Sequence, residues 1–189
     1  MLFFISGFIF FGLATVNFWQ ASHPDEGETV EEAISTSNAI VDMQQLTSKP
    51  ITEDTTFDFQ KTDVVSVILV PANYGCNECP QRANTYLDAF NSHSIFNDLS
   101  TEVFTVIIAS SERTATHFTR IHQFGFPTFQ LGDMPSVIRD ETTEDCVALI
   151  IDTSSMKALT KVHLEQIHVT DHYDTIFKAS RDAYRQTNP

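Results

Sequence analysis

A strongly apolar strand that is followed closely by an amphipathic helix constrains the fold of this chain more than any other feature. Residues 64–70 read VVSVILV, a nearly continuous run of β-branched and apolar side chains, as expected of a strand buried on both faces. The segment from Pro71 to Gly75 interrupts this run. Residues 80–90 then carry one apolar stripe with the i, i+3, i+4, i+7 spacing of a helix, formed by Ala83, Tyr86, Leu87 and Phe90. A sheet strand crossed by a helix is therefore predicted.

The alternation of β-rich and helical segments continues to the end of the sequence. The predicted strands are residues 64–70, 103–109, 126–131, 146–151 and 159–167. The predicted helices are residues 80–90, a segment that begins after Ser111 and ends near Gly125, and residues 172–186. Strands that are connected through helices indicate an α/β domain. We therefore expect residues 57–189 to form a central mixed sheet flanked by helices.

The N-terminal residues have a different character. Leu2 to Trp19 reads LFFISGFIFFGLATVNFW, without a charged side chain, and about 20 helical residues span a bilayer core of about 30 Å. We expect residues 1–20 to be a retained transmembrane anchor, with a cleaved signal peptide as the alternative. No Lys or Arg precedes Lys49, so the positive-inside rule gives no orientation. Residues 21–56 are polar and acidic and are predicted to form a linker, in which residues 28–46 are the candidate for a loose helix.

The charge balance excludes one class of partner. Eleven basic residues stand against 25 acidic ones, which gives a formal net charge of −14 at pH 7. Such a surface repels a phosphate backbone instead of releasing its counterions. Nucleic acid is therefore not an expected partner, and the acidic residues are interpreted as a solvated surface.

A CxxC motif, Cys76-Asn77-Glu78-Cys79, occupies the junction between the predicted strand and the predicted helix. The first backbone N–H groups of a helix have no internal partner, and the positive end of the helix dipole stabilises an anion there. A thiol at this position loses its proton near neutral pH. Cys76 is therefore predicted to be the nucleophile, and Cys79, one helical turn later, is predicted to resolve the mixed disulfide.

The two neighbours of Cys79, Pro80 and Glu78, affect the motif in different ways. Pro80 suits the first turn of a helix, because its missing N–H costs little there. Glu78 places a carboxylate near the thiolate, which should raise the pKa of the nucleophilic thiol and make the pair a weaker oxidant. We therefore expect a reductant or an isomerase, not a strong oxidant.

Other uses of a cysteine pair fit the sequence less well. A structural zinc site needs four ligands, and the chain has no second CxxC. Haem attachment needs a His directly after the second cysteine, where Pro80 stands. An inert structural disulfide stays open, because any close cysteine pair in an exported protein can be oxidised. Against it, a two-residue loop constrains the unfolded chain very little.

Several segments resemble the thioredoxin-like superfamily. VSVILVPANYGCNECPQRANTYLDAF is similar to the first strand, the active-site turn and the helix of these proteins. FTVIIASSERTATHFTRIHQFGFPTFQLGD, CVALIID and TKVHLEQIHVTDHYDTIFKA resemble the membrane-anchored branch of the superfamily. That branch includes the thiol proteins of cytochrome c maturation and, closest in layout, the methylamine dehydrogenase maturation protein. The resemblance covers residues 57–179 and lies in layout more than in identity.

The resemblance implies a thioredoxin-like domain at residues 57–189, held on the periplasmic side of the inner membrane by a single transmembrane helix. In such proteins the residues that match Cys76 and Cys79 attack and resolve the disulfides of client proteins. A membrane or periplasmic protein is the implied electron donor, and no cofactor is expected. The aromatic residue that commonly precedes the first cysteine is Gly75 here.

The family's cis-proline, which faces the dithiol from the start of a strand, would fall at Cys146. Cys146 is then either a third redox group or a metal ligand beside Cys76 and Cys79, or a small buried residue at a strand start. An alternative register makes Pro127 the facing proline, but it leaves too much chain before the terminal hairpin.

Two other functions stay open. A copper-delivery protein of this fold would use two cysteines and a histidine, which are ligands suited to copper, and His163, His168 and His172 are the candidates. A non-catalytic thioredoxin-like adaptor is the other. A peroxidase of the peroxiredoxin type shares the fold, but PANYGCNEC does not reproduce the offsets of its motif.

Overall fold

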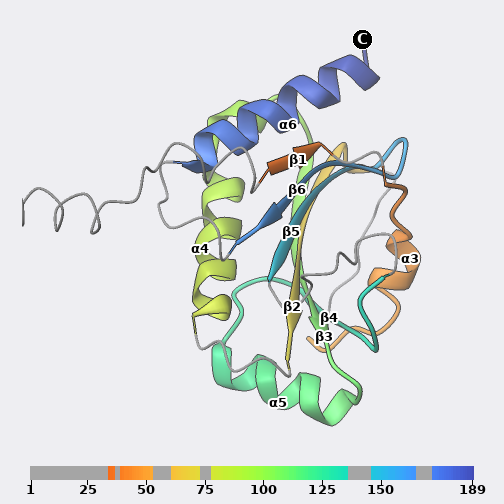
Figure 1. Cartoon of the computed structure of the whole chain (residues 1–189), viewed down its shortest axis with the longest axis vertical. Coiled ribbons are helices and arrows are strands. Elements are labelled where there is room, and N and C mark those ends of the chain that lie inside the picture. The colour runs from red at the N-terminus through yellow and green to blue at the C-terminus, as the bar shows by residue number, and fades with distance from the viewer. Residues whose placement is uncertain (1–33, 37–38, 53–60, 73–77, 136–145, 165–171) are drawn as a thin grey trace, which may run out of the picture.

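The computed structural model describes residues 34–36, 39–52, 61–72, 78–135, 146–164 and 172–189 (Figure 1). Within them, six strands form one sheet in the order β1-β6-β5-β2-β3-β4. The strands are β1 (Ile34–Thr36), β2 (Val64–Pro71), β3 (Thr101–Ile108), β4 (Thr128–Leu131), β5 (Val147–Asp152) and β6 (Lys157–His163). The helices are α3 (Met43–Leu46), α4 (Cys79–Ser92), the 3-10 helix η2 (Ser94–Phe96), α5 (Glu112–His122) and α6 (Tyr173–Thr187).

β2 is a central strand of the sheet. It pairs in parallel with β3 and antiparallel with β5, where Leu69 lies opposite Val147. Every residue of β2 before Pro71 is buried, which confirms the predicted buried strand. Because β4 continues the parallel part beyond β3 and β6 continues the antiparallel part beyond β5, the sheet is mixed, as predicted.

The sheet separates two apolar clusters. The even-numbered apolar residues of β2 belong to one cluster, which also contains Tyr86 and Phe90 of α4 and Phe177 of α6. The odd-numbered ones belong to a second cluster with Met43 and Leu46 of α3. Figure 1 shows α4 and α6 on one side of the sheet and α3 on the other. Helices thus cover both faces of the sheet. The apolar side chains on these faces are removed from water, which is the main stabilising effect in such a core.

Part of the predicted linker is built into this core. β1 pairs antiparallel with β6, and Val41, Met43 and Leu46 are buried. The domain boundary predicted at Phe57 is therefore too late, and a strand at residues 34–36 replaces part of the loose helix considered for residues 28–46. The apolar residues of this segment are few and irregularly spaced, so that sequence periodicity does not reveal them.

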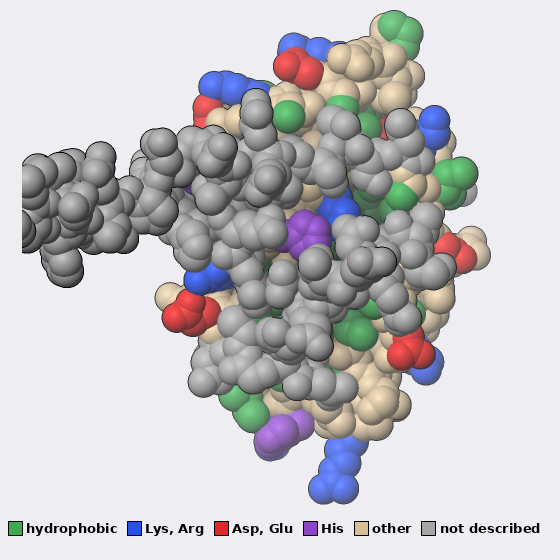
Figure 2. All heavy atoms as spheres, viewed as in Figure 1, with side chains coloured by type: hydrophobic (Ala, Val, Ile, Leu, Met, Phe, Trp, Pro, Cys, Tyr) green, Lys and Arg blue, Asp and Glu red, His purple; other side chains and the backbone are tan. Residues whose placement is uncertain are grey.

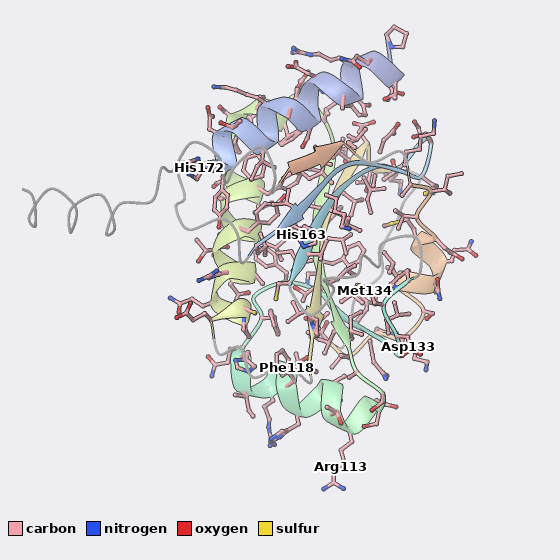
Figure 3. All side chains as sticks on the ribbon, viewed as in Figure 1. Arg113, Phe118, Asp133, Met134, His163 and His172 are labelled. Atoms are coloured by element: carbon pink, nitrogen blue, oxygen red, sulfur yellow. The ribbon has the colours of Figure 1, made fainter. Side chains whose placement is uncertain are left out.

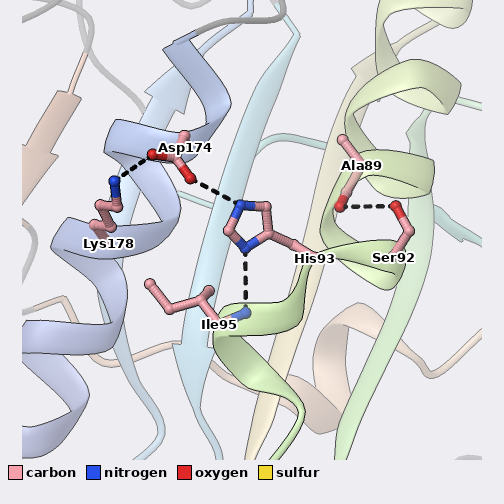
Figure 4. A network of polar contacts seen from close by, with 6 residues as sticks. All are labelled: Ala89, Ser92, His93, Ile95, Asp174 and Lys178. Atoms are coloured by element: carbon pink, nitrogen blue, oxygen red, sulfur yellow. Dashed lines mark hydrogen bonds and ion pairs between the residues drawn. The ribbon is translucent and has the colours of Figure 1, made fainter.

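A small polar network joins α6 to the end of α4 (Figure 4). The ring of His93 lies 3.0 Å, Nε2 to Oδ1, from the carboxylate of Asp174, and its Nδ1 accepts a hydrogen bond from the N–H of Ile95 at 3.3 Å. Lys178 pairs with the same carboxylate. The hydrogen bonds from Lys178 and His93 lower the pKa of Asp174. The His93 ring also packs edge-on to Phe177, with 5.0 Å between centroids, so polar and aromatic contacts together dock α6.

Within the described ranges, no helix combines the length and the apolar character that a membrane crossing requires. The predicted anchor, residues 1–20, lies outside the described residues.

Asp152 organises the turn between β5 and β6. Its carboxylate accepts hydrogen bonds from the N–H of Ser154 at 3.0 Å, from the hydroxyls of Ser154 and Ser155 at 2.7 Å each, and from the side-chain amide of Asn188 at 3.2 Å. Burial raises the pKa of Asp152, but these hydrogen bonds outweigh it and the net pKa is lowered. The residues that follow α6 are thereby tied to this turn.

Replacing Asp152 with Asn should lower the free energy of unfolding by about 1–3 kcal/mol near neutral pH, because the charged acceptor of these bonds is lost. Since the folded-state pKa is lowered, the carboxylate stabilises the fold above its unfolded pKa of about 3.9 and loses this effect as the pH falls through the folded pKa. Urea unfolding of both proteins at about pH 7 and about pH 3 measures the difference. The difference should shrink at the lower pH, and an equal difference at both values contradicts the assignment.

Candidate functional site

The second cysteine of the CxxC motif begins α4, a short connection after the end of β2. Cys79 is 4% exposed and belongs to the apolar cluster that includes Val70 and Ala83. Pro80 follows in the first helical turn and is buried. Cys76 falls in the range 73–77, outside the described residues. The structure therefore places one cysteine of the predicted pair, at the junction of strand and helix that the sequence indicates.

The start of α4 is suited to an anion. Glu78 is the N-cap residue, yet its side chain makes no capping hydrogen bond to the helix. The N-terminal N–H groups of a helix, together with the positive end of its dipole, favour a negative charge. In general, an exposed thiol at a helix start is favoured as a thiolate, the form that reacts with disulfides.

Arg82, one turn into α4, contacts both the motif and the end of β6. Its Nη2 lies 2.8 Å from Oε2 of Glu78, and its Nη1 donates to the carbonyl of Leu164 at 3.4 Å. The side chain of Arg82 is 27% exposed and that of Glu78 is 71% exposed. The guanidinium thus links the carboxylate inside the CxxC motif to the residue that follows β6.

Cys146 lies immediately before β5 and is completely buried. β5 runs antiparallel to β2 with Val147 opposite Leu69, so Cys146 stands beside the C-terminal end of β2, where the chain leaves for α4. Its side chain belongs to the same apolar cluster as that of Cys79, and its carbonyl accepts a hydrogen bond from the N–H of Leu164 at 3.0 Å. The starts of α4 and β5 and the end of β6 thus meet at one end of the sheet.

The sheet topology places Pro127 and Cys146, the two residues considered for the position of the facing proline, before different strands. Pro127 precedes β4, which pairs in parallel with β3 and lies at the edge of the sheet. The strand that runs antiparallel beside β2 is β5, and Cys146 precedes it. Cys146, and not Pro127, therefore precedes the strand that runs antiparallel beside β2.

The histidines proposed as copper ligands lie on separate elements. Figure 3 shows His163 at the end of β6 and His172 at the start of α6, apart from one another. His168 lies outside the described residues. In the part of the chain that the structure describes, no three His, Cys, Asp or Glu side chains are close enough to hold a metal ion.

Periodicity alone does not identify Arg82 as a neighbour of the motif or Tyr173 as a neighbour of α4. Tyr173 begins α6, and its ring meets that of Tyr86 edge-on at 5.4 Å between centroids. Burial raises the pKa of Tyr173, and the positive charge of Arg82 acts in the opposite direction. The i, i+4 spacing of Glu78 and Arg82 is a signal for their ion pair that is visible in the sequence, whereas the approach of Tyr173 depends on the fold.

The described surface is mixed in charge. On the face shown in Figure 2, the Lys and Arg side chains of the described residues stand singly, several of them beside acidic ones. They form no continuous basic area on that face, and the expectation that nucleic acid is not a partner stays a prediction.

Because Cys146 is completely buried, iodoacetamide should leave it unmodified in the reduced native protein and modify it only after unfolding. Peptide mass spectrometry of protein alkylated before and after denaturation measures this difference. Rapid modification of Cys146 in the native state contradicts its placement in the core.

Comparisons with known proteins agree with this architecture. No protein-family model matches the chain, and a search of curated proteins finds no match either. Among solved structures, a protein designated thiol:disulfide interchange protein DsbE from Chlorobium tepidum superposes with a TM-score of 0.53 at 12% identity, covering 79% of this chain and 98% of that one.

Two peroxidase-type structures are similar to the same extent. Peroxidoxin BcpB from Mycobacterium tuberculosis has a TM-score of 0.50 and 17% identity, over 78% of this chain and 96% of its own. The bacterioferritin comigratory protein from Xanthomonas campestris has a TM-score of 0.50 and 12% identity, over 78% and 99% respectively. At such identities the likeness concerns the fold. With β2, α4, β3 and the β5–β6 hairpin arranged as described, the chain has the thioredoxin-like fold.

Proposed function

We propose that this protein is a thiol:disulfide oxidoreductase that acts through Cys76 and Cys79. The observation that carries the proposal is the position of Cys79 at the first residue of α4, beyond the C-terminal end of the central strand β2. In open α/β sheets, reactive sites gather at the carboxyl ends of the strands, and the helix start there stabilises a thiolate. The low exposure of Cys79 suits a resolving cysteine, which reacts only within its own chain.

The exchange proceeds in two steps with balanced electrons. The Cys76 thiolate attacks one sulfur of a client disulfide, forms a mixed disulfide and releases the other client sulfur as a thiolate. Cys79, once deprotonated, attacks the Cys76 sulfur, forms the Cys76–Cys79 disulfide and releases the first client sulfur. Two electrons have then passed to the client, and a thiol donor protein must return them for a further cycle.

The direction and place of this reaction belong to the same proposal. A carboxylate at Glu78 makes the pair less oxidising, so the protein acts as a reductant or an isomerase. The apolar segment Leu2 to Trp19 supports attachment to a membrane. The inner membrane, with the domain on its outer side, follows from the resemblance to membrane-anchored thioredoxin-like proteins. The clients are then exported proteins with disulfides, and the electron donor is a membrane or periplasmic thiol protein.

Changing Cys76 to Ser should reduce the rate of insulin disulfide reduction with dithiothreitol to the rate measured without protein, because the attacking sulfur is lost. Changing Cys79 to Ser should also abolish turnover but allow mixed disulfides to accumulate, which non-reducing gels detect. Ser92→Ala, at the exposed C-terminal end of α4, is the control and should keep the wild-type rate. Unchanged insulin reduction by Cys76→Ser would disprove the assignment of the nucleophile.

The same protein preparation separates the two alternative functions. A copper-delivery protein holds one tightly bound copper per chain after reduction, and a non-catalytic adaptor neither binds copper nor reduces insulin. Turnover that is lost in Cys76→Ser, without stoichiometric copper, supports the oxidoreductase. Both functions use Cys76, which lies outside the described residues. Among the candidate copper ligands, His163 and His172 lie on separate elements, whereas the position of Cys79 at the start of α4 supports the oxidoreductase.

A further inference from the structure

Two arginines on α5 differ from the exposed cations of α6. On α6, Lys178 and Arg185 each pair with an aspartate one helical turn earlier. On α5, Arg113 and Arg120 are exposed, and no Asp or Glu stands three or four residues from either of them. Within the described part of the chain, no ion pair includes these two arginines. Their charges are therefore available to a binding partner.

A histidine completes a row of basic side chains along α5. Arg113, His117 and Arg120 share one face, because residues three, four or seven positions apart lie on the same side of a helix. All three are exposed and border a hollow in the surface. Nη2 of Arg120 donates to Nδ1 of His117 at 3.4 Å, so Nε2 is left as a donor. The row therefore offers hydrogen-bond donors over about 10 Å, the rise of seven helical residues.

An exposed apolar side chain adjoins this row. Ile121 is 56% exposed and is one of two large apolar side chains, with Ile40, that are so open to water among the described residues. It stands one helical turn after His117. A single exposed apolar residue is common on protein surfaces. Here it lies beside arginines without carboxylate partners, and arginine is enriched at protein–protein interfaces.

The opposite face of α5 is anchored in the core. Ala115 is buried in the apolar cluster that contains Cys79, and Phe118 packs against this cluster. Figure 3 shows Arg113 pointing away from the sheet and Phe118 on the side of α5 toward it. The hydroxyl of Ser111 caps the start of the helix. A face that is already fixed in this way loses little conformational freedom when a partner binds.

Charge complementarity defines the partner. A guanidinium binds a carboxylate through two parallel hydrogen bonds. The chain has 25 acidic and 11 basic residues, so an acidic partner is repelled by most of the surface and is oriented toward unpaired cations. Because β2 and β3 run in parallel, α4 and α5 both follow strands that end at the same edge of the sheet. A partner on α5 is therefore bound near the end of the sheet at which α4 begins.

We propose that the exposed face of α5, formed by Arg113, His117, Arg120 and Ile121, is a docking surface for an acidic segment of a partner protein. Two carboxylates about 10 Å apart match the two arginines, and an extended segment supplies them from residues three positions apart. An apolar residue of the segment covers Ile121. The proposal goes beyond the oxidoreductase function, because this contact requires no sulfur atom.

Fluorescence anisotropy with the full chain tests the docking surface. The probe is a labelled peptide with glutamates three residues apart and one leucine, and its counterpart carries glutamine in place of each glutamate. The acidic peptide should bind saturably and more tightly than its counterpart. Arg113→Glu/Arg120→Glu should weaken its binding about tenfold or more, because two attractive contacts become repulsive. Ile121→Ser should weaken it about fivefold through the lost apolar contact.

Lys178→Glu/Arg185→Glu is the matched control. It changes the net charge by the same amount at the same seven-residue spacing on α6, and it should leave the affinity within about twofold of wild type, because distant charges are screened. Equal losses in the two double variants would overturn the proposal. So would a glutamine peptide that binds as tightly as the acidic one, or an acidic peptide that does not bind saturably.

Two further outcomes would assign the face to another occupant and would also contradict the proposal. One is a wild-type dimer in sedimentation velocity that Arg113→Glu/Arg120→Glu dissociates, because a second copy then occupies the face. The other is tighter peptide binding after Glu28, Glu31 and Glu32 are changed to Gln, because the acidic residues of the chain itself then compete for it. Peptide binding is measured without turnover, so a failure to reduce insulin contradicts the oxidoreductase function alone.

Discussion

The burial of β2 on both faces is the constraint on which the arrangement of the neighbouring strands and of α4 depends. With β3 along one side and β5 along the other, a slip of one residue in its pairing would turn every apolar side chain of this strand to the wrong cluster. The point at which the chain leaves the sheet is therefore set, and with it the start of α4. Tyr86 and Phe90 pack α4 onto the face of the sheet that carries the even-numbered residues of β2. Cys79 is therefore held in a defined position at the end of the sheet.

The elements that the sequence predicts well are those whose apolar pattern is long. β2, α4 and α6 have runs or stripes that leave little choice of structure, and the folded elements lie close to the predicted ranges. β1 and α3 are too short to show a period, and their apolar residues lie within a polar and acidic segment. Their place in the fold depends on pairing with β6 and on packing against the far face of the sheet, which are contacts distant in sequence.

The residues of the candidate site also differ in how far the sequence alone predicts their positions. The position of Cys79 at a helix start is a local property, so the order of strand, cysteine and helix predicts it. The place of Cys146 depends on which strand lies antiparallel to β2. The sequence left two candidates for the residue that faces the dithiol, Cys146 in one register and Pro127 in the other. The contact of Arg82 with Leu164 joins residues on α4 and after β6. No local pattern encodes that contact, although the ion pair with Glu78 has a recognisable spacing.

The contacts of β1 and α3 with the sheet determine where a recombinant fragment of this protein can begin. A recombinant fragment cut at Phe57 would lose β1 and the residues around α3, which bury Val41, Met43 and Leu46 against the sheet. The flank of β6 would then present unpaired N–H and carbonyl groups, and one apolar face would be open to water. Such a fragment should associate with its own copies. Residues 34–46, although polar in composition, therefore protect the edge strand and the apolar face of the sheet from contact with other copies.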